Sequence, residues 1–434
     1  MGLSTAAAPA CLDENRTLRI FTIFLLYAGQ GIPIGLFDFA IPGWMAVNGA
    51  SASEIGYVVA MAGLPWSFKF LNGFLMDRYT LLSMGRRRVW IAGAQLVIVA
   101  SLLIFAFIDP GPREYILLGI IAMIVNSAVT FQDVAVDGLT IDILPNSDQG
   151  IGGAMMTGGQ ALGIAASATL TGTLIYVYGA SAAYVACAIL VGFVTVHVLW
   201  VRERSGERRF PWSEGEAHPR NERLRASNWG QIFRETFKAV LKPRSLLWLP
   251  IPFARGLAYG TMIVAVPLIA SQYTGWTEDR LGSVNGSGNF IAGIVTVTLG
   301  SILSLKLGAQ KLLALSTAAF LCFICWIIYA MPNWFDPRYM TAIVIGWLGI
   351  YALLGVGIMV ISMRYCSPRV AATQFSIYMA VHNLGITFAG LLIGMLAFLS
   401  TPLAMLQALV AVMAVMLGVL LLAKYPEENL SVDT

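Results

Sequence analysis

The feature that most constrains this chain is the recurrence of apolar runs of about 20 residues along its whole length, each long enough to cross a bilayer as a helix. Of its 434 residues, 58% are hydrophobic and 12% are charged, whereas soluble domains carry about 25% charged residues. An α-helix satisfies its backbone hydrogen bonds internally, even in lipid. The composition therefore predicts an all-α, polytopic membrane protein.

The apolar runs predict twelve transmembrane helices in two six-helix bundles. The expected spans are residues 20–46, 55–76, 89–108, 115–144, 148–178, 181–201, 246–272, 281–304, 312–331, 340–363, 370–399 and 402–423. The long polar stretch 202–244 divides the chain into an N-terminal bundle (1–201), a linker and a C-terminal bundle (245–434). Within the linker, residues 228–241 are interpreted either as an amphipathic helix on the membrane surface or as solvated chain.

Charge and internal similarity refine this layout. Most of the 27 Lys and Arg residues fall in the N-terminus, the even-numbered loops and the C-terminus, which predicts that both termini are cytoplasmic. The net charge of +4 reflects this sorting and does not indicate a nucleic-acid partner. Leu162-Gly163 and Leu384-Gly385 occupy matching places in spans five and eleven, which suggests two parallel repeats of six spans.

The fourth expected span carries acidic residues that lipid does not tolerate without partners. Its polar residues recur at spacings of four and three and so share one helix face: Asn126, Thr130, Asp133, Asp137 and Thr140. Such a stripe predicts a polar path through the membrane. Asp133 and Asp137 are candidates for carrying protons, or for a fixed ion pair with Lys69 of span two, which is expected at about the depth of Asp137.

Asp38 and Arg255 are the other charged candidates inside the spans. Asp38 follows Gly29, Gly31, Pro33 and Gly35, which are expected to bend or break span one; it is assigned a proton or ligand role or a local structural role. Arg255 is expected either to bind a carboxylate or phosphate of a solute or to pair with Asp133 or Asp38.

Uncharged polar residues complete the candidate solute site. With Arg255 and Lys69, the predicted solute-binding set is Asn126, Tyr259, Asn285, Asn289, Gln374, Tyr378 and His382. Gln374, Tyr378 and His382 recur every four residues and share one face of span eleven. For His382 an interhelical hydrogen bond and a proton relay both remain open, and for Asn285 and Asn289 helix packing is the alternative to a solute role.

The loop between spans two and three concentrates charge at one membrane surface. It runs from Gly73-x-x-x-Asp77-Arg78 to Gly85-Arg86-Arg87-Arg88. These residues form either an anchor at the inner surface or a gate latch that grips a neighbouring helix end. Asp142, within a turn of the inner end of span four, is expected to pair with one of the three arginines.

This loop resembles the loop motif of the major facilitator superfamily. The stretches LPWSFKFLNGFLMDRYTLLSMGRRRVW, Gln132-Asp133-x-x-x-Asp137-x-x-x-x-Asp142-x-Leu144-Pro145 and Ala372-Thr373-Gln374-Phe375 resemble its branch of AmpG-type muropeptide permeases and acetyl-coenzyme A transporters. The resemblance implies two bundles of six helices that alternate in access, and proton-coupled import across the bacterial inner membrane.

These observations favour a secondary transporter that imports a polar anionic solute with protons. The expected solute is an anhydromuropeptide-like cell-wall fragment, with a siderophore, a coenzyme A-type conjugate or a peptide as alternatives. An intramembrane transferase is a remote alternative, because the sequence has no nucleophile–base pair and no HxxxD, HExxH or metal-ligand cluster. We therefore expect no enzymatic activity, no cofactor and no metal, and a monomer whose partners are the solute, protons and membrane lipid.

Overall fold

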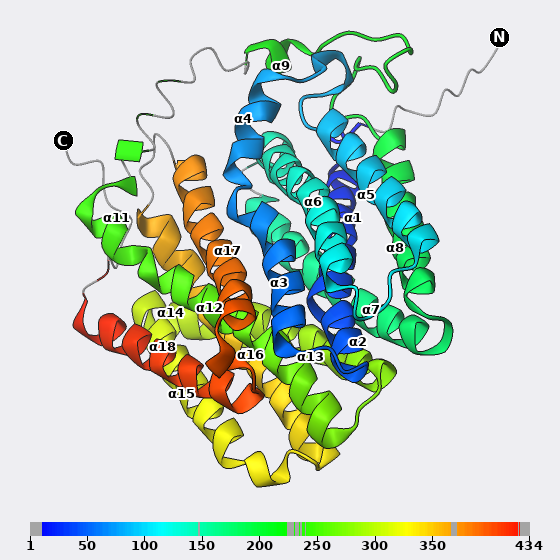
Figure 1. The fold of residues 1–434 in the computed structure, drawn as a ribbon. Coiled ribbons are helices and arrows are strands. Elements are labelled where there is room, and N and C mark those ends of the chain that lie inside the picture. The colour runs from blue at the N-terminus through cyan, green and yellow to red at the C-terminus, as the bar shows by residue number, and fades with distance from the viewer. Residues whose placement is uncertain are drawn as a thin grey trace, which may run out of the picture.

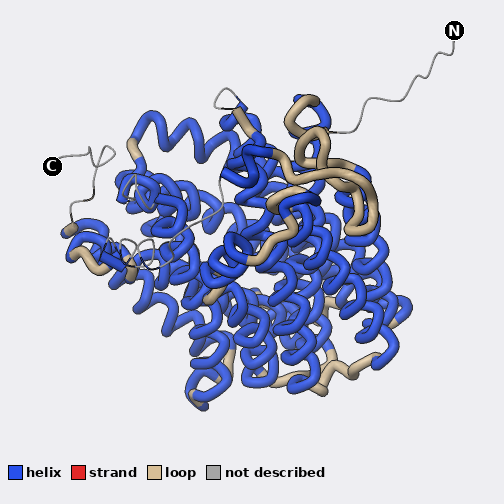
Figure 2. Tube along the Cα trace, turned by 90° about the horizontal axis from the view of Figure 1, so that it is seen from above, coloured by secondary structure: helices blue, strands red, loops and turns tan. Residues whose placement is uncertain are grey.

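The computed structural model describes residues 11–145, 148–223, 230, 234, 237–238, 240–365, 371–423 and 425. Within these residues the chain forms helices and turns without a strand, and the only extended pairing is one bridge between Cys11 and Arg202. Figure 2 shows the helices standing side by side with the loops at their ends.

The helices of the N-terminal half begin with a span made of three consecutive segments. These are α1 (Arg16–Gly35), the π-helical η1 (Leu36–Ala40) and α2 (Ile41–Val47). They are followed by α3 (Ala52–Ser67), α4 (Phe70–Arg78), the 3₁₀ turn η2 (Leu82–Met84), α5 (Arg88–Ile108), α6 (Tyr115–Ile143), α7 (Gln149–Tyr178), α8 (Ala180–Trp200) and α9 (Pro219–Arg223).

The helices of the C-terminal half follow the same pattern. They are α11 (Pro243–Trp248), α12 (Pro250–Ile269) with the π-helical η4 (Ala270–Thr274), α13 (Glu278–Val295) with the π-helical η5 (Thr296–Gly300), and α14 (Ser301–Leu307). The chain continues with α15 (Ala309–Tyr329), η6 (Met331–Asn333), α16 (Pro337–Tyr365), α17 (Ala371–Met395), η7 (Ala397–Leu399) and α18 (Pro402–Leu422).

Among the described residues, 11 helical stretches are long and apolar enough to cross a membrane. They coincide with eleven of the twelve predicted spans. The second predicted span is divided, since α3 ends at Ser67 and α4 begins at Phe70. Pro65 lies in the last turn of α3 and has no N–H to continue the hydrogen-bond ladder. The break places Lys69 at the N-terminus of α4.

Of the two outcomes expected for the Gly and Pro residues of span one, a bend or a break, the break does not occur. α1 continues through Pro33 to Gly35 and passes into η1. The glycines instead allow a close helix contact: a Cβ added at Gly31 would lie 2.5 Å from the Gln160 carbonyl oxygen of α7, and one at Gly35 2.7 Å from Ser167. Small residues at this seam therefore set the distance between α1 and α7.

The two halves are packed by the same rule. α1 lies along α7, and α12 lies along α17. A Cβ at Gly163 would collide with the Ala28 carbonyl oxygen of α1, and a Cβ at Gly385 with the Phe253 carbonyl oxygen of α12. The two Leu-Gly pairs thus occupy equivalent seams. Between the halves, α7 packs on α13 and α3 packs on α17 (Figure 1).

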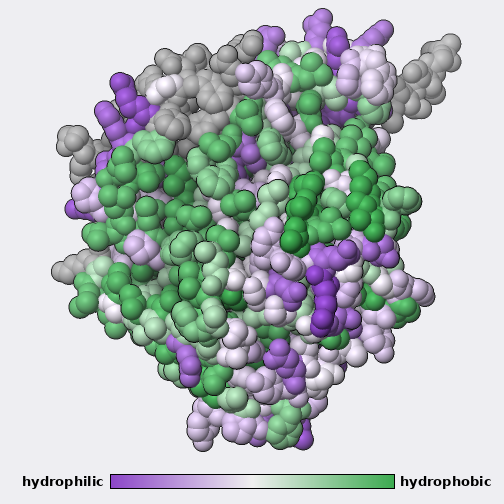
Figure 3. Space-filling model, viewed as in Figure 1, coloured by the Kyte–Doolittle hydropathy of each residue, from purple (hydrophilic) through white to green (hydrophobic). Residues whose placement is uncertain are grey.

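The outer helices expose apolar side chains, as lipid contact requires. Phe107 of α5 is 93% exposed and Phe193 of α8 is 70% exposed. Figure 3 shows apolar residues over much of one face, with hydrophilic residues at the end where α9 lies and also across the lower right of the view. We call this end, which holds the start of α1 and the ends of α4 and α8, the linker end.

The described first part of the predicted linker is folded against the N-terminal half. The backbone N–H of Leu12 donates to Arg202 O (2.9 Å) and that of Arg208 donates to Ser83 O (2.6 Å). We call residues 201–223 the cap. Most of the expected amphipathic helix at 228–241 lies outside the described residues.

Candidate functional site

A buried charge cluster lies where the break in span two meets α6. Lys69 Nζ lies 2.7 Å from one carboxylate oxygen of Asp133, and the Gln30 side-chain amide of α1 donates to the other at 2.6 Å. Asp133 is 5% exposed. The predicted partner of Lys69 is therefore confirmed, and Asp133 rather than Asp137 is the acid that it contacts.

The rest of the α6 stripe also contacts other spans of the N-terminal half. The Tyr27 hydroxyl of α1 donates to Asp137. Trp66 Nε1 donates to Asn126 at 2.8 Å, and the Asn72 amide donates to Thr130 at 3.1 Å. Each polar residue of the predicted stripe from 126 to 137 thus has a hydrogen-bond or ion-pair partner from another span. Thr140 instead donates to Val136 O within α6.

Arg255 of α12 lies on aromatic and backbone groups of α16. Its guanidinium carbon is 4.2 Å from the ring centre of Tyr351, and the Tyr351 hydroxyl donates to Arg255 O at 3.3 Å. Nη1 lies 3.2 Å from His382 Nε2. Among the described residues, no carboxylate lies within 4.0 Å of this guanidinium. The expected pairing with Asp133 or Asp38 is absent from this conformation.

These contacts fix the tautomer of His382. A guanidinium only donates hydrogen bonds, so His382 Nε2 accepts from Arg255. The opposite nitrogen, Nδ1, lies 3.4 Å from Pro252 O, a group that only accepts. The ring is thus neutral with its proton on Nδ1. In this conformation His382 makes an interhelical hydrogen bond, the first of the two predicted alternatives.

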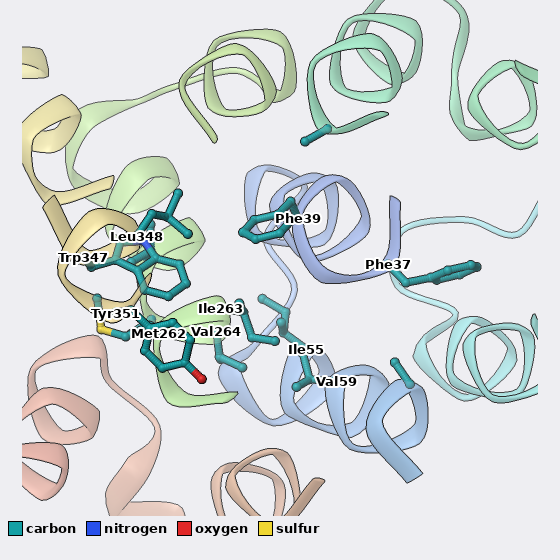
Figure 4. Close-up of a cluster of buried hydrophobic side chains, with 14 of the residues drawn as sticks. Phe37, Phe39, Ile55, Val59, Met262, Ile263, Val264, Trp347, Leu348 and Tyr351 are labelled. Atoms are coloured by element: carbon teal, nitrogen blue, oxygen red, sulfur yellow. The ribbon is translucent and has the colours of Figure 1, made fainter. Parts of the chain in front are cut away.

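Asp38 connects the two halves. It lies in the π-helical segment η1, a distortion that is frequent at functional sites. One of its carboxylate oxygens accepts a hydrogen bond from the Tyr259 hydroxyl of α12 at 3.1 Å. The Tyr259 ring contacts Tyr351 (centroids 5.3 Å apart), so Asp38 and Arg255 lie on either side of one aromatic pair. Figure 4 shows Tyr351 and Trp347 together on α16, within the same buried cluster.

Gln374 and Tyr378 lie in a different environment from His382. Both are fully buried, and Gln374 Nε2 donates to the Tyr378 hydroxyl (2.7 Å) and to Tyr365 O (3.1 Å). Tyr378 in turn donates to Ser245 at 2.9 Å. The shared helical face predicted from the sequence therefore contains a buried network in the C-terminal half near the linker end.

The two asparagines of α13 are close to each other. Asn285 is buried, and the Asn289 amide donates to Asn285 O at 3.0 Å. Gly286 beside them packs against Ala165 of α7. A groove of about 420 Å³ follows this α7–α13 seam, and its lining is mostly apolar, with Thr169 and Ser287 as the polar residues. It lies apart from the charged clusters.

The arginines of the loop between spans two and three contact the N-terminal half. Arg86 Nη1 lies 3.4 Å and Arg87 Nε 3.9 Å from Asp142, which confirms the predicted pairing. The Arg88 side chain donates to backbone carbonyls of Val198, Leu199, Met84, Arg208 and Arg209. Asp77 and Arg78 end α4, and their side chains lie outside the described residues.

Glu203 of the cap was missed by the sequence analysis. Its carboxylate accepts the backbone N–H groups of Arg86 (2.9 Å), Arg87 (2.7 Å) and Arg88, so it caps the N-terminus of α5. A helix N-terminus stabilises a negative charge. Burial nevertheless raises the pKa of Glu203 above its ordinary value. The only sequence signal was a Glu-Arg pair directly after a span.

Glu207 completes this network. It accepts from the backbone N–H of Arg204 (3.0 Å) and from the Asn221 amide (2.7 Å). Burial, and then the neighbouring Glu203 carboxylate, raise the pKa of Glu207 to about 8. Arg204 also donates to Asp142 O at 3.2 Å, so the cap and the end of α6 are joined.

At the end of the molecule opposite the linker end, the first turn of α13 contacts two helices of the other half. The Asn48 amide, at the end of α2, donates to Glu278 at 3.0 Å, and the Thr173 hydroxyl of α7 donates to Asp279. Nearer the middle, Asn383 donates to Trp66 O at 3.3 Å. The sequence offered no spacing that would have singled out these contacts.

The sequence profile of the Major Facilitator Superfamily matches residues 20–254, more than half of the chain. The chain belongs to the major facilitator superfamily. The solved crystal structure of the nucleoside transporter NupG has the same fold as this superfamily member. The two structures align with a TM-score of 0.64 at 11% identity, and the alignment covers 93% of this chain and 98% of that chain.

Individual relatives match parts of this superfamily protein. It is 29% identical to the anhydromuropeptide permease of Escherichia coli K12 over 163 residues, which is 36% of this chain and 33% of the permease. It is 22% identical to the folate-biopterin transporter of Synechocystis over 86% of this chain and 73% of that transporter. The chain thus spans about a third of the length of the first of these relatives. Membership of the family and the 11 candidate spans agree with the prediction of a multi-pass membrane protein.

Proposed function

We propose that this superfamily member is a secondary active transporter that imports a polar anionic solute together with protons. The observation that carries the proposal is the buried cluster of Lys69, Asp133 and Asp137. A charge inside a membrane is costly, so two acids and a lysine held between spans point to ion or solute movement. In this proposal Asp133 and Asp137 carry the proton, and Asp38 is the third candidate.

The geometry supports a simple coupling step. The Lys69–Asp133 contact joins the start of α4 to α6, and its attraction requires an ionised Asp133. When a proton neutralises Asp133, Lys69 loses its charged partner, and α4 becomes free to move relative to α6. Because α4 is separated from α3 by the break at residues 68–69, this movement need not bend a continuous helix.

The solute is proposed to contact Arg255, Lys69, Asn126, Tyr259, His382, Asn285 and Asn289. An anhydromuropeptide-like fragment is the first candidate, supported by the partial similarity to the permease. A siderophore or a coenzyme A-type conjugate is the alternative, and a folate is added because the folate-biopterin transporter matches over most of both chains. Gln374 and Tyr378 are left out, since their polar groups bond within a buried network.

Gating is proposed at the loop between spans two and three. Asp77, Arg78, Arg86, Arg87, Arg88 and Asp142 are the candidate gating residues. Arg86 and Arg87 already contact Asp142 within one half, so a gate here would act by moving α4 and α6 relative to the other half. We also propose a bacterial inner-membrane location, cytoplasmic termini and a monomeric state.

Uptake into proteoliposomes tests the function. Labelled anhydromuropeptides, a ferric siderophore, a coenzyme A ester and folate are offered to the purified chain, each with and without an inward proton gradient. Accumulation of at least one solute only in the presence of the gradient is expected. Equal uptake with and without the gradient would contradict proton coupling.

Substitution of the two acids separates coupling from binding. Asp133→Asn and Asp137→Asn keep the side-chain size but cannot titrate, so at least one should abolish gradient-driven accumulation while sparing solute exchange. Asp109→Asn is the matched control, because Asp109 ends α5 with φ 49°, a conformation that Asn adopts readily. If both variants accumulate solute at the control rate, the two acids have a structural role only.

A further inference from the structure

Arg255 is a cation within the spans that has no acidic partner among the described residues. Lys69 has Asp133 at 2.7 Å, whereas the neighbours of the Arg255 guanidinium are a tyrosine ring and a neutral histidine. Its Nε is buried without a hydrogen-bond partner among the described residues. A buried donor without an acceptor is costly, so this group is prepared for an acceptor that the chain itself does not supply.

The contacts around Arg255 leave its Nε without an acceptor among the described residues. Tyr351 covers one face, and Nη1 is directed at His382. Nη2 lies against Gly355, one turn after Tyr351 on α16, where an added Cβ would come within 2.9 Å of it. Nε is buried and has no acceptor among the described residues, and each terminal nitrogen carries a second N–H. Paired N–H groups of this kind match the two oxygens of a carboxylate or phosphate.

We propose that Arg255 forms an oxyanion subsite of the transport pathway and that Gly355 is the residue that positions its guanidinium. The missing side chain at position 355 lets the guanidinium lie flat on α16 beside the Tyr351 ring. The Tyr351 hydroxyl holds the backbone of the same arginine through Arg255 O at 3.3 Å. Tyr351 thus contacts both the guanidinium and the backbone carbonyl of Arg255. The inference rests on the proposed function, because it names the chemistry of the transported solute.

Three sugars that share the same ring but differ in their charged group test the subsite. D-glucuronate carries a carboxylate, D-glucose 6-phosphate carries a phosphate, and D-glucose carries neither. Apparent affinities are obtained from the rise in the thermal unfolding midpoint of the purified full chain as each probe is titrated. The wild type should bind one or both anions more tightly than glucose, and the preferred anion identifies a carboxylate or a phosphate as the natural group.

Single substitutions distinguish the contribution of Arg255 to anion affinity from that of Gly355. Arg255→Ala should weaken binding of the preferred anion by about 10- to 100-fold, the range for one charge-assisted contact. Gly355→Ala should weaken it by about tenfold, the lower end of that range. Neither change should alter binding of glucose. Gly349→Ala is the matched control, because a Cβ at this position of the same helix meets nothing within 4 Å.

A double variant distinguishes positioning from general disturbance of α16. A lysine at position 255 has no planar group to lie against residue 355. Adding Gly355→Ala to Arg255→Lys should therefore cause no further loss of anion affinity, and the two effects should not add. Additive losses would show that Gly355 acts independently of the guanidinium and would overturn the positioning role.

The inference and the proposed function fail in different ways. A wild type that both anions stabilise no more than glucose does, or a Gly355→Ala variant that behaves like Gly349→Ala, overturns the subsite. These binding measurements use no gradient. If the anions fail to bind but solute still accumulates with the proton gradient, the subsite is overturned and the proposed transport stands. If the anions bind as expected but no solute accumulates with the gradient, the subsite stands and the proposed proton coupling is overturned.

Discussion

The two halves of the molecule are packed alike but charged differently. In the N-terminal half, Lys69 is paired with Asp133, Arg86 with Asp142 and Arg19 with Asp148. In the C-terminal half, Arg255 lies deep in α12 with aromatic, glycine and histidine neighbours and, among the described residues, without an acid. The cations named in the N-terminal half therefore have counter-ions within it, whereas Arg255 in the C-terminal half has no acidic partner among the described residues.

The similarity of packing makes this difference informative. α1–α7 and α12–α17 approach through equivalent glycines, and the first span of each half contains a π-helical segment, η1 and η4. A repeat that preserves backbone contacts but not charges indicates that the two halves share a mechanical role. Their chemical roles are then divided, with proton chemistry proposed on one side and anion binding on the other.

The largest expected effect is on unfolding free energy, and it tests the difference in charge pairing between the two halves. Lys69→Met leaves Asp133 buried without its cation, and such a loss costs about 3–5 kcal/mol of unfolding free energy. Arg255→Met removes a cation that has no acidic partner among the described residues, so it should leave stability unchanged or raise it. Unfolding of the two detergent-solubilised variants, followed by circular dichroism, measures both.

A double variant is the control for this prediction. Lys69→Met combined with Asp133→Asn removes both charges and should recover most of the lost stability. If Arg255→Met instead destabilises the protein as much as Lys69→Met does, the proposed contrast between the halves is wrong. An acid that pairs with Arg255 in solution would then have to be found.

A smaller effect should be equal in the two halves. Gly163→Ala and Gly385→Ala each place a methyl group against the backbone of the neighbouring helix, and overpacking of this kind costs about 1–3 kcal/mol. Gly192→Ala in α8 is the control, because its Cβ would meet nothing within 4 Å. Thermal unfolding of the three variants would test the repeat; a loss confined to one half would argue against equivalent seams.

The smallest expected effect is confined to the cap. The pKa of Glu207 is about 8 in the folded protein, against an ordinary value of 4.5. Between these values the folded cap holds a proton that the opened cap releases, so cap stability falls as pH rises through this window. Opening of residues 201–223, followed by hydrogen exchange corrected for intrinsic rates, should become more frequent by up to about tenfold per pH unit, the limit for one proton.

Glu207→Gln should remove the contribution of Glu207 and so weaken the pH dependence of this opening, since an amide does not titrate; the neighbouring Glu203, whose pKa is also raised by burial, retains its own contribution. The membrane-spanning helices should exchange equally in the variant and the wild type. A wild-type cap that opens equally often at pH 5 and pH 8 would show that the pKa of Glu207 is the same in the closed and the opened cap, and would contradict this prediction.

The sequence predicted what depends on composition and helical period. Apolar runs located the spans, and the spacing of Asn126, Asp133 and Asp137 placed them on one face that contacts other spans. The break at residues 68–69 was not predicted, because Pro65 alone does not distinguish a kink from an interruption. The close approach of α1 to α7 was not predicted from the glycines of span one, because close approach and helix breaking use the same residue type.

The sequence also did not predict which residues, distant along the chain, would contact the charged side chains. Tyr27 and Gln30 are ordinary residues of an apolar helix until α1 packs on α6 and brings them to Asp137 and Asp133. Likewise, Gly355 is important only because the Arg255 guanidinium lies against it. Such partners follow from the three-dimensional arrangement of helices, which a single sequence does not specify.

The cap changes where one half of the molecule can be separated from the other. A cut at residue 201 would remove Glu203 from the start of α5 and leave the backbone N–H groups of Arg86, Arg87 and Arg88 without their acceptor. A cut beyond residue 223 would leave this network intact. The N-terminal half therefore includes part of what the composition marks as connecting chain, and fragments prepared for co-expression would have to be divided after α9.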